Sequence, residues 1–182
     1  MFYGEGSDKP LFLLRKMIMS KTLEERKAAL KELSVFVKGD IKATIEVLNG
    51  FPITVRLLDP PLHEFVPHSE DKIAEMAKEL GLTVEEAKKR GDGLKESNQM
   101  LGHRGVRLGV TYPEVTEMQV RAILEAAGEL IKSGKKALPE IMIPVTCTVN
   151  ELNNQKIIVD KVHAEVQKAL GVKIPYMYGT MI

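Results

Sequence analysis

The chain has 182 residues, 44% of them hydrophobic and 28% charged, which is enough to bury the core of about one soluble globular domain. Its 26 basic and 25 acidic side chains nearly cancel, so the composition predicts neither nucleic acid nor an anionic membrane as a partner. Because it has one cysteine, no signal-peptide pattern and no apolar run of membrane-spanning length, we expect a cytoplasmic protein without disulfides.

Helices are predicted through the first third of the chain. Apolar residues recur at helical spacing over residues 9–19. Thr22 begins a second helix, because Glu25 follows at the spacing of a capping box. Gly39 is a point at which this helix can break, and a third helical segment is expected over residues 40–48.

The stretch over residues 51–65, FPITVRLLDPPLHEF, changes from a strand into a stiff loop. Apolar side chains alternate along residues 52–57, which predicts a half-buried strand. Asp59 and the two prolines after it then prevent both a helix and a continuing central strand. Arg56 should therefore lie near the carboxyl end of the strand, where parallel α/β sheets and barrels bind ligands.

A pair of helices is predicted next, over residues 70–80 and from Thr83 onward. We interpret residues 69–95 as a helical insertion that decorates a loop. The segment over residues 101–110, LGHRGVRLGV, is basic and interrupted by glycines, and it precedes a predicted helix over residues 114–132.

The last third alternates strand, helix and strand. A short apolar strand is predicted over residues 140–145, a long helix that Asn150 can cap over 149–170, and a strand-like run over 174–182. Strands separated by long helices pair in parallel through right-handed crossovers, so the predicted fold class is α/β. Three strands after a helical start indicate a segment of something larger.

Arg56 is the sharpest candidate for chemistry. A guanidinium at the ligand-facing end of a strand can hold a phosphate or a carboxylate through two parallel hydrogen bonds. The alternative is an arginine that reaches solvent and pairs with Asp59 or Glu64. Local spacing does not choose between the two interpretations.

A second candidate is GHRGVR, which contains Arg104 and Arg107. Its two glycines let the backbone approach a ligand closely, and its arginines add positive charge. The pattern is neither a Walker A loop nor a dinucleotide fingerprint, and a solvent-exposed basic turn is the alternative. Facing one cleft together with Arg56, this segment would form a site for a dianion.

Other polar residues carry less weight. The four histidines show no metal-ligand spacing, and three loop carboxylates could hold Mg²⁺ without any spacing that requires it. Cys147 has no partner near it in sequence, so we interpret it as a small buried hydrophobe. The histidines and carboxylates are His63, His68, His103, His163, Asp59, Glu64 and Glu114.

Several strings resemble the pyruvate phosphate dikinase family, which belongs to the phosphoenolpyruvate (PEP)-utilising enzymes with a (β/α)8 barrel. They are TVRLLDPPLHEF, LGHRGVRLGVTYPE, EMQVRAI, PEIMIPV and YGTMI, in the family's order. PEP synthase and enzyme I of the sugar phosphotransferase system are similar at a greater distance. The resemblance covers essentially the whole chain. It implies a partial TIM (β/α)8 barrel, roughly units two to four, with residues 1–182 as a single partial domain.

The same resemblance implies a function. The family converts ATP, phosphate and pyruvate to AMP, diphosphate and PEP through a phosphohistidine on a swivelling domain, with Mg²⁺. Arg56 and Arg104 match its phosphoryl-binding arginines, and we assign supporting roles to Arg107, His103 and Asp59. The catalytic set and the metal site are expected to be incomplete in this chain.

On this interpretation the chain is part of a transferase that is inactive alone. Its expected partners are PEP or pyruvate, the phosphohistidine domain and further copies of itself in a homo-oligomer. A second interpretation stays open: a non-catalytic partial barrel that binds phosphate-like anions or self-associates through open sheet edges.

Overall fold

The computed structural model describes residues 7–67, 69–94, 98 and 101–182, so His68 and the first six residues lie outside the described part. The α-helices are α1 (Asp8–Met19), α2 (Leu23–Leu48), α3 (Glu70–Leu80), α4 (Val84–Gly93), α5 (Gly105–Thr111), α6 (Pro113–Lys132) and α7 (Val149–Leu170). A short 3-10 helix, η1, spans Leu62–Phe65, and the strands are β1 (Pro52–Arg56), β2 (Leu138–Ile143) and β3 (Met177–Thr180).

The three strands form one parallel sheet in the order β1-β2-β3, which confirms the predicted α/β class and parallel pairing. Arg56 is opposite Met142, and Ile143 is opposite Thr180, so the carboxyl ends of all three strands meet at one edge. The strand β2 begins and ends two residues earlier than predicted, and β3 is shorter than the predicted run over residues 174–182. Pro144 and Pro175 flank them, and proline lacks the N–H that a strand ladder uses.

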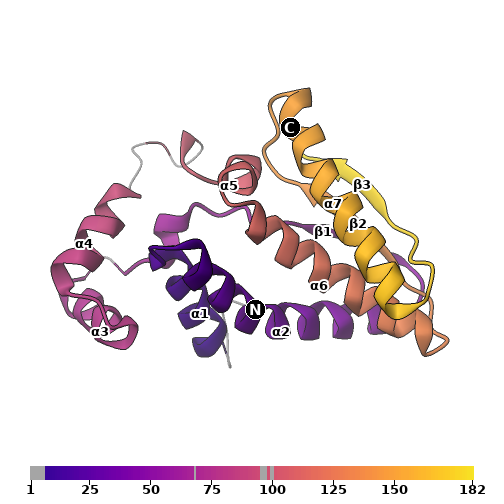
Figure 1. Cartoon of the computed structure of the whole chain (residues 1–182), viewed down its shortest axis with the longest axis horizontal. Helices are drawn as coiled ribbons and strands as arrows, with labels where there is room; N and C mark the ends of the chain where they lie inside the picture. Colours follow the sequence, from indigo (N-terminus) through magenta and orange to yellow (C-terminus); the bar gives the residue numbers. More distant parts are fainter. Residues whose placement is uncertain (1–6, 68, 95–97, 99–100) are drawn as a thin grey trace.

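One face of the sheet is covered by helices. Ile53 and Val55 of β1 pack into the same core as α6 and α7, whereas Thr54 and Arg56, which alternate with them, are exposed on the other face. This alternation follows from the two-residue period of a strand. Figure 1 shows α6 and α7 in front of the strands. Arg56 therefore projects from the open face, away from the hydrophobic core.

The helix α2 is continuous through Gly39, so the predicted break there was wrong. Along its length α2 packs against α6 and buries Leu30, Leu33 and Ile45. A glycine in a helix interior costs roughly 1 kcal/mol relative to alanine. Burial of several leucine-sized side chains contributes more than that, so tertiary packing keeps the helix intact.

The helices α3 and α4 lie at the opposite end of the molecule from the sheet (Figure 1). They form a separate hydrophobic cluster with Met19 and Val66. An ion pair of 2.7 Å between Lys21 Nζ and Glu86 Oε1 joins α4 to the loop before α2. The position of α3 and α4, away from the sheet, agrees with a helical insertion over residues 69–95. The insertion itself stays a prediction. Among the described residues, no helix is both long enough and apolar enough to cross a bilayer.

Candidate anion site at the end of β1

The site begins where β1 ends. After Arg56 the chain turns through Leu58, whose backbone N–H donates to Gln119 Oε1 of α6 at 3.1 Å. This bond fixes the loop against the helix layer. Asp59 follows with only 5% of its surface exposed. A carboxylate buried this deeply needs hydrogen-bonding or cationic partners.

Arg104 supplies those partners from a segment 45 residues further along the chain. Its Nη2 donates to Asp59 Oδ2 at 2.8 Å, and its Nε lies 3.2 Å from Oδ1 and 3.1 Å from the Asp59 carbonyl oxygen. A guanidinium matches the carboxylate fork in this way, and such pairs are strong and directional. The pair therefore joins the end of β1 to the start of α5.

Arg56 approaches the same carboxylate from the other side. Its Nη1 lies 3.5 Å from Asp59 Oδ2 and 3.5 Å from the sulfur of Met181, and its side chain is 54% exposed. The partner foreseen for Arg56 is thus Asp59 rather than Glu64. Two guanidinium groups share one carboxylate, so an excess positive charge remains beside the exposed donors of Arg56. Such an arrangement can hold an anion.

The start of α5 is held against the end of β2. The backbone N–H of Val106 donates to the carbonyl of Pro144 at 2.9 Å. Gly105 has φ +55°, and a Cβ at this position would lie 2.8 Å from the Pro144 oxygen and 3.0 Å from Cβ of Val145. Only glycine fits this backbone and this space. The segment that carries Arg104 is thus not a solvent-exposed turn, because Gly105 and Val106 are buried against the end of β2.

His103 packs beside the ring of Tyr112, with centroids 5.4 Å apart, and Arg26 lies over the same ring at 4.2 Å. Burial is the main cause that lowers the pKa of His103. The charge of Arg107 acts in the same direction, and a hydrogen bond to the Arg107 backbone opposes both. Nε2 of His103 has no hydrogen-bond partner within the described residues. His103 therefore serves as a packing residue of the segment that carries Arg104.

Arg107 does not reach Asp59. Its Nη1 donates to the carbonyl of Leu101 at 2.9 Å, so it closes the GHRGVR segment on itself. The structure thus brings Arg56, Arg104 and Asp59 together. Arg107 is not part of this group and binds the Leu101 carbonyl instead. The supporting role of Arg107 stays a prediction.

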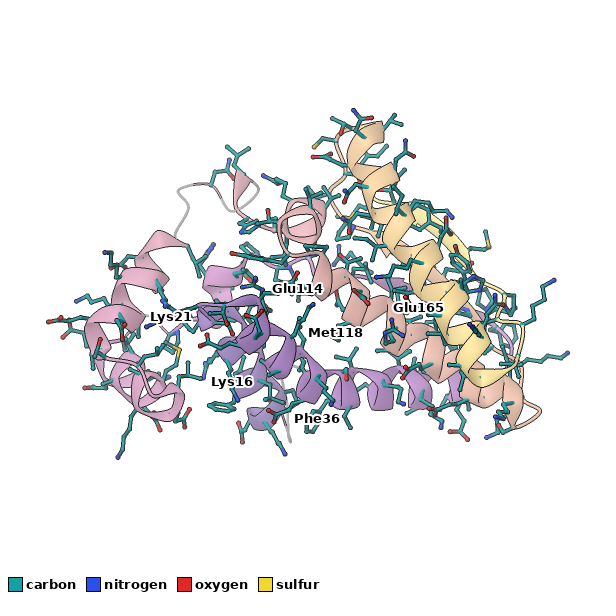
Figure 2. The ribbon with its side chains drawn as sticks, in the orientation of Figure 1. Lys16, Lys21, Phe36, Glu114, Met118 and Glu165 are labelled. Carbon is teal, nitrogen blue, oxygen red and sulfur yellow. The ribbon has the colours of Figure 1, made fainter. Side chains whose placement is uncertain are left out.

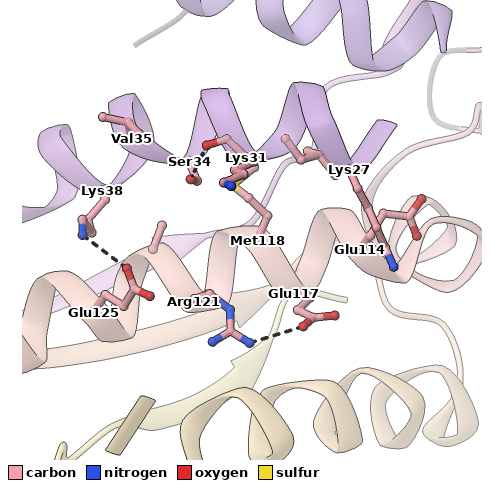
Figure 3. Close-up of a pocket in the computed structure, with 12 residues that line it drawn as sticks. Lys27, Lys31, Ser34, Val35, Lys38, Glu114, Glu117, Met118, Arg121 and Glu125 are labelled. Carbon is pink, nitrogen blue, oxygen red and sulfur yellow. Dashed lines mark hydrogen bonds and ion pairs between the residues drawn. The ribbon is translucent and has the colours of Figure 1, made fainter. Parts of the chain in front are cut away.

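A groove of about 430 Å³ lies between α2 and α6, and Figure 3 shows its walls. Met118 of α6 lies between the two helices (Figure 2). Cations on the walls pair with carboxylates, as in Lys38 with Glu125 and Arg121 with Glu117, both at 3.3 Å. Because these charges are neutralised locally, the groove is a weaker candidate for binding an anion.

Comparison with known proteins identifies the family of the chain. The sequence profile described as "PEP-utilising enzyme, PEP-binding domain" matches residues 11–182. The chain belongs to the family of PEP-utilising enzymes. The resemblance to the dikinase family is confirmed by curated relatives of that name.

The relatives of this PEP-utilising chain include pyruvate, phosphate dikinases from Clostridium symbiosum (52% identical over 93% of the chain) and Entamoeba histolytica (51% over 92%). A chloroplastic pyruvate, phosphate dikinase from Flaveria trinervia is 44% identical over the whole chain. The chain spans about a fifth of the length of these relatives. Because one relative is chloroplastic by name, the cytoplasmic location stays a prediction.

This member of the PEP-utilising family shows no group of three or more His, Cys, Asp or Glu that could hold a metal ion in the part of the chain described here. Asp59 is occupied by arginines, and buried Glu114 pairs with Arg26. Their oxygens are taken by cations, so these two carboxylates do not fit Mg²⁺. We therefore derive no chemical step through a metal.

Cys147 corrects the sequence interpretation, because it is exposed rather than buried. It lies in the loop between β2 and α7, where its backbone N–H donates to Glu151 Oε2 at 3.0 Å. The cap of α7 is Thr148 instead of Asn150: Thr148 Oγ1 accepts from the N–H of Glu151 at 3.3 Å in a capping box. The capping bonds hold the loop at the surface and Cys147 with it.

Proposed function

We propose that the chain is a segment of the PEP/pyruvate-binding (β/α)8 barrel of a pyruvate, phosphate dikinase, roughly barrel units two to four. In this proposal Arg56 and Arg104 bind the phosphoryl group of PEP. The observation that carries it is the convergence of both guanidinium groups on one oxygen of Asp59, at the carboxyl end of a parallel strand. Ligands of parallel α/β folds bind at this end of the sheet.

Phosphoryl transfer depends mainly on positioning and on stabilising negative charge, and fixed guanidinium groups supply both. Asp59 uses Nε and Nη2 of Arg104, so Nη1 has no hydrogen bond within the described residues. Arg56 is more than half exposed. Donors of both arginines are therefore free for a second anion, while Asp59 keeps the two groups from repelling each other apart.

The reaction of the whole enzyme is part of the same proposal. The longer protein would transfer a phosphoryl group from a phosphohistidine on another domain to pyruvate, which yields PEP. Mg²⁺ would bind residues outside the described set and would neutralise charge on the phosphoryl oxygens. The present chain would bind PEP or phosphate without turnover.

Isothermal titration of the chain with PEP, and separately with inorganic phosphate, tests the proposal. We expect both anions to bind, and Arg56→Ala and Arg104→Ala each to weaken binding at least about tenfold, as the loss of a charge-assisted hydrogen bond predicts. Arg121→Ala is the matched control, because Arg121 of α6 pairs with Glu165 of α7 instead of Asp59. Equal weakening by all three variants, or no binding by the parent chain, would contradict the proposal.

A further inference from the structure

We propose that Val145 is a positioning residue for Arg104. Val145 has φ +55°, in the left-handed region. The inference rests on the proposed function, because Arg104 is the phosphoryl-binding residue in that proposal. In this role Val145 acts through the first turn of α5.

The backbone of Val145 is strained. A β-branched side chain at positive φ brings its Cβ substituents close to the backbone, so valine is a true outlier there. Strain of this kind persists only where the surrounding structure fixes it, and such places cluster at functional sites. The residue must therefore be held from both sides.

Both neighbours of Val145 are anchored. Before it, the carbonyl of Pro144 accepts the N–H of Val106 at 2.9 Å. After it, the N–H of Thr146 donates to the carbonyl of Met181 at 3.0 Å, and its Oγ1 is 2.6 Å from Oγ1 of Thr180. The chain has to turn sharply between a bond to α5 and a bond to the end of β3. The left-handed conformation makes that turn.

The side chain of Val145 uses this turn to cover Gly105. A Cβ built on Gly105 would lie 3.0 Å from Cβ and 3.1 Å from Cγ2 of Val145, so the valine lies directly against the residue that follows Arg104. The Pro144 carbonyl holds the next N–H of α5. Together they clamp the backbone on the carboxyl side of Arg104, and Asp59 holds its guanidinium. The loop after β2 thus determines the direction of the Arg104 guanidinium, which binds Asp59 at the end of β1.

Val145→Gly removes the clamp and relieves the strain at once. We expect the variant to fold, to lose the protection of the Arg104 Nε–H from solvent exchange in ¹⁵N NMR spectra, and to bind phosphate about tenfold more weakly. Val145→Asn is the conservative variant, because asparagine tolerates positive φ and retains Cβ over Gly105. It should keep phosphate affinity within about twofold of the parent chain.

Asn49→Gly is the matched control. Asn49 is also left-handed, with φ 44°, but it ends α2 at the other end of β1. Its substitution should leave the Arg104 signal and the affinity unchanged. If Val145→Gly folds with an unchanged Arg104 signal and unchanged affinity, the inference is wrong, although phosphate binding by the parent chain would still support the proposed function. If Val145→Gly does not fold, Val145→Asn decides: loss of the Arg104 signal and of phosphate affinity in that variant, although it retains Cβ over Gly105, overturns the inference. Loss of the signal in a chain that never binds phosphate would overturn the proposed function instead.

Discussion

Asp59 and Arg104 form a buried ion pair that joins the end of β1 to the start of α5, with 2.8 Å between Asp59 Oδ2 and Arg104 Nη2. The side chains are 7% and 19% exposed. Because both are largely removed from water, each depends on the other for its charge to be tolerated. The pair thus contributes to the fold and to the site together.

Removal of the carboxylate should therefore cost stability. In Asp59→Ala the charge of Arg104 loses its partner inside the protein, and we expect the free energy of unfolding to fall by about 3 kcal/mol, measured by urea denaturation. Asp160→Ala is the control, since Asp160 pairs with Lys156 at the surface, and the cost there should stay below about 1 kcal/mol. Equal losses of stability in the two variants would show that the buried pair contributes no more than the surface pair.

Substitution of either arginine should also abolish efficient turnover in a full-length protein that carries this segment. If the proposed function holds, each substitution removes a donor to the transferring phosphoryl group, so Arg56→Ala and Arg104→Ala should lower kcat by about 10² to 10³. Arg104→Lys should lower kcat as well. The planar guanidinium can bind Asp59 through one edge and a phosphate through another, and a lysine ammonium cannot. Steady-state formation of PEP from pyruvate measures this. Near-normal kcat in Arg56→Ala would exclude the role assigned to it.

Two glycines in helices should respond to alanine in opposite ways. A Cβ at Gly39 of α2 meets nothing within 4 Å, so Gly39→Ala should stabilise the chain by about 0.5 to 1 kcal/mol. A Cβ at Gly128 of α6 would lie 2.5 Å from Leu170 Cδ1 and 2.8 Å from Ile174 Cδ1, so Gly128→Ala should destabilise it. Thermal denaturation compares the two with the parent chain. The same sign of change in both would mean that space around Cβ does not decide the outcome.

Gly39 also shows where prediction from sequence failed. Local rules give a helix break at an internal glycine, but the packing of α2 against α6 is decided by residues about 80 to 90 positions away, as in the Lys38–Glu129 contact at 3.0 Å. The cap of α7 was missed for a different reason. Thr148 and Glu151 have the same capping-box spacing as Thr22 and Glu25, so the signal was present in the sequence.

The site itself was only partly predictable. The alternation around Arg56 and the prolines after Asp59 place one arginine at a strand end by local physics. The glycines and arginines of GHRGVR made Arg104 a candidate, and the family resemblance assigned it a role. Nothing local shows that Arg104, 45 residues later, meets the same carboxylate. The strained backbone of Val145 and the exposure of Cys147 depend on contacts between loops. The hydrophobic periodicity of helices and strands carries no information about such contacts.

His103 should make stability depend on pH. Burial lowers its pKa below the usual 6.5, so the folded chain holds fewer protons than the unfolded chain between the two pKa values. The stability from this group is present above pH 6.5 and is lost as the pH falls through the lower, folded pKa. Urea denaturation between about pH 7.5 and about pH 5.5 should show falling stability, and His103→Gln should flatten the slope. Parallel curves for the two proteins would contradict this account.

The open edges of the sheet should cause self-association of the isolated chain. The strands β1 and β3 each have one neighbour among the described residues, and an unpaired strand edge is a template for another strand. Pro52 at the start of β1 removes one donor, so β3 is the more available edge. Met177, at the start of β3, is 67% exposed and adds an apolar side chain there. Sedimentation velocity over a range of concentrations should therefore show oligomers.

A charge at this edge should oppose the association, because a lysine on an edge strand disfavours pairing with a second copy. Met177→Lys should shift the sedimentation profile toward the monomer. Ile157→Lys is the matched control: Ile157 is 70% exposed but lies on α7, so the same change in charge should leave association unaltered. A parent chain that is monomeric at all concentrations and melts cooperatively would show that its edges are protected. If both lysine variants dissociate equally, net charge rather than the β3 edge governs the association.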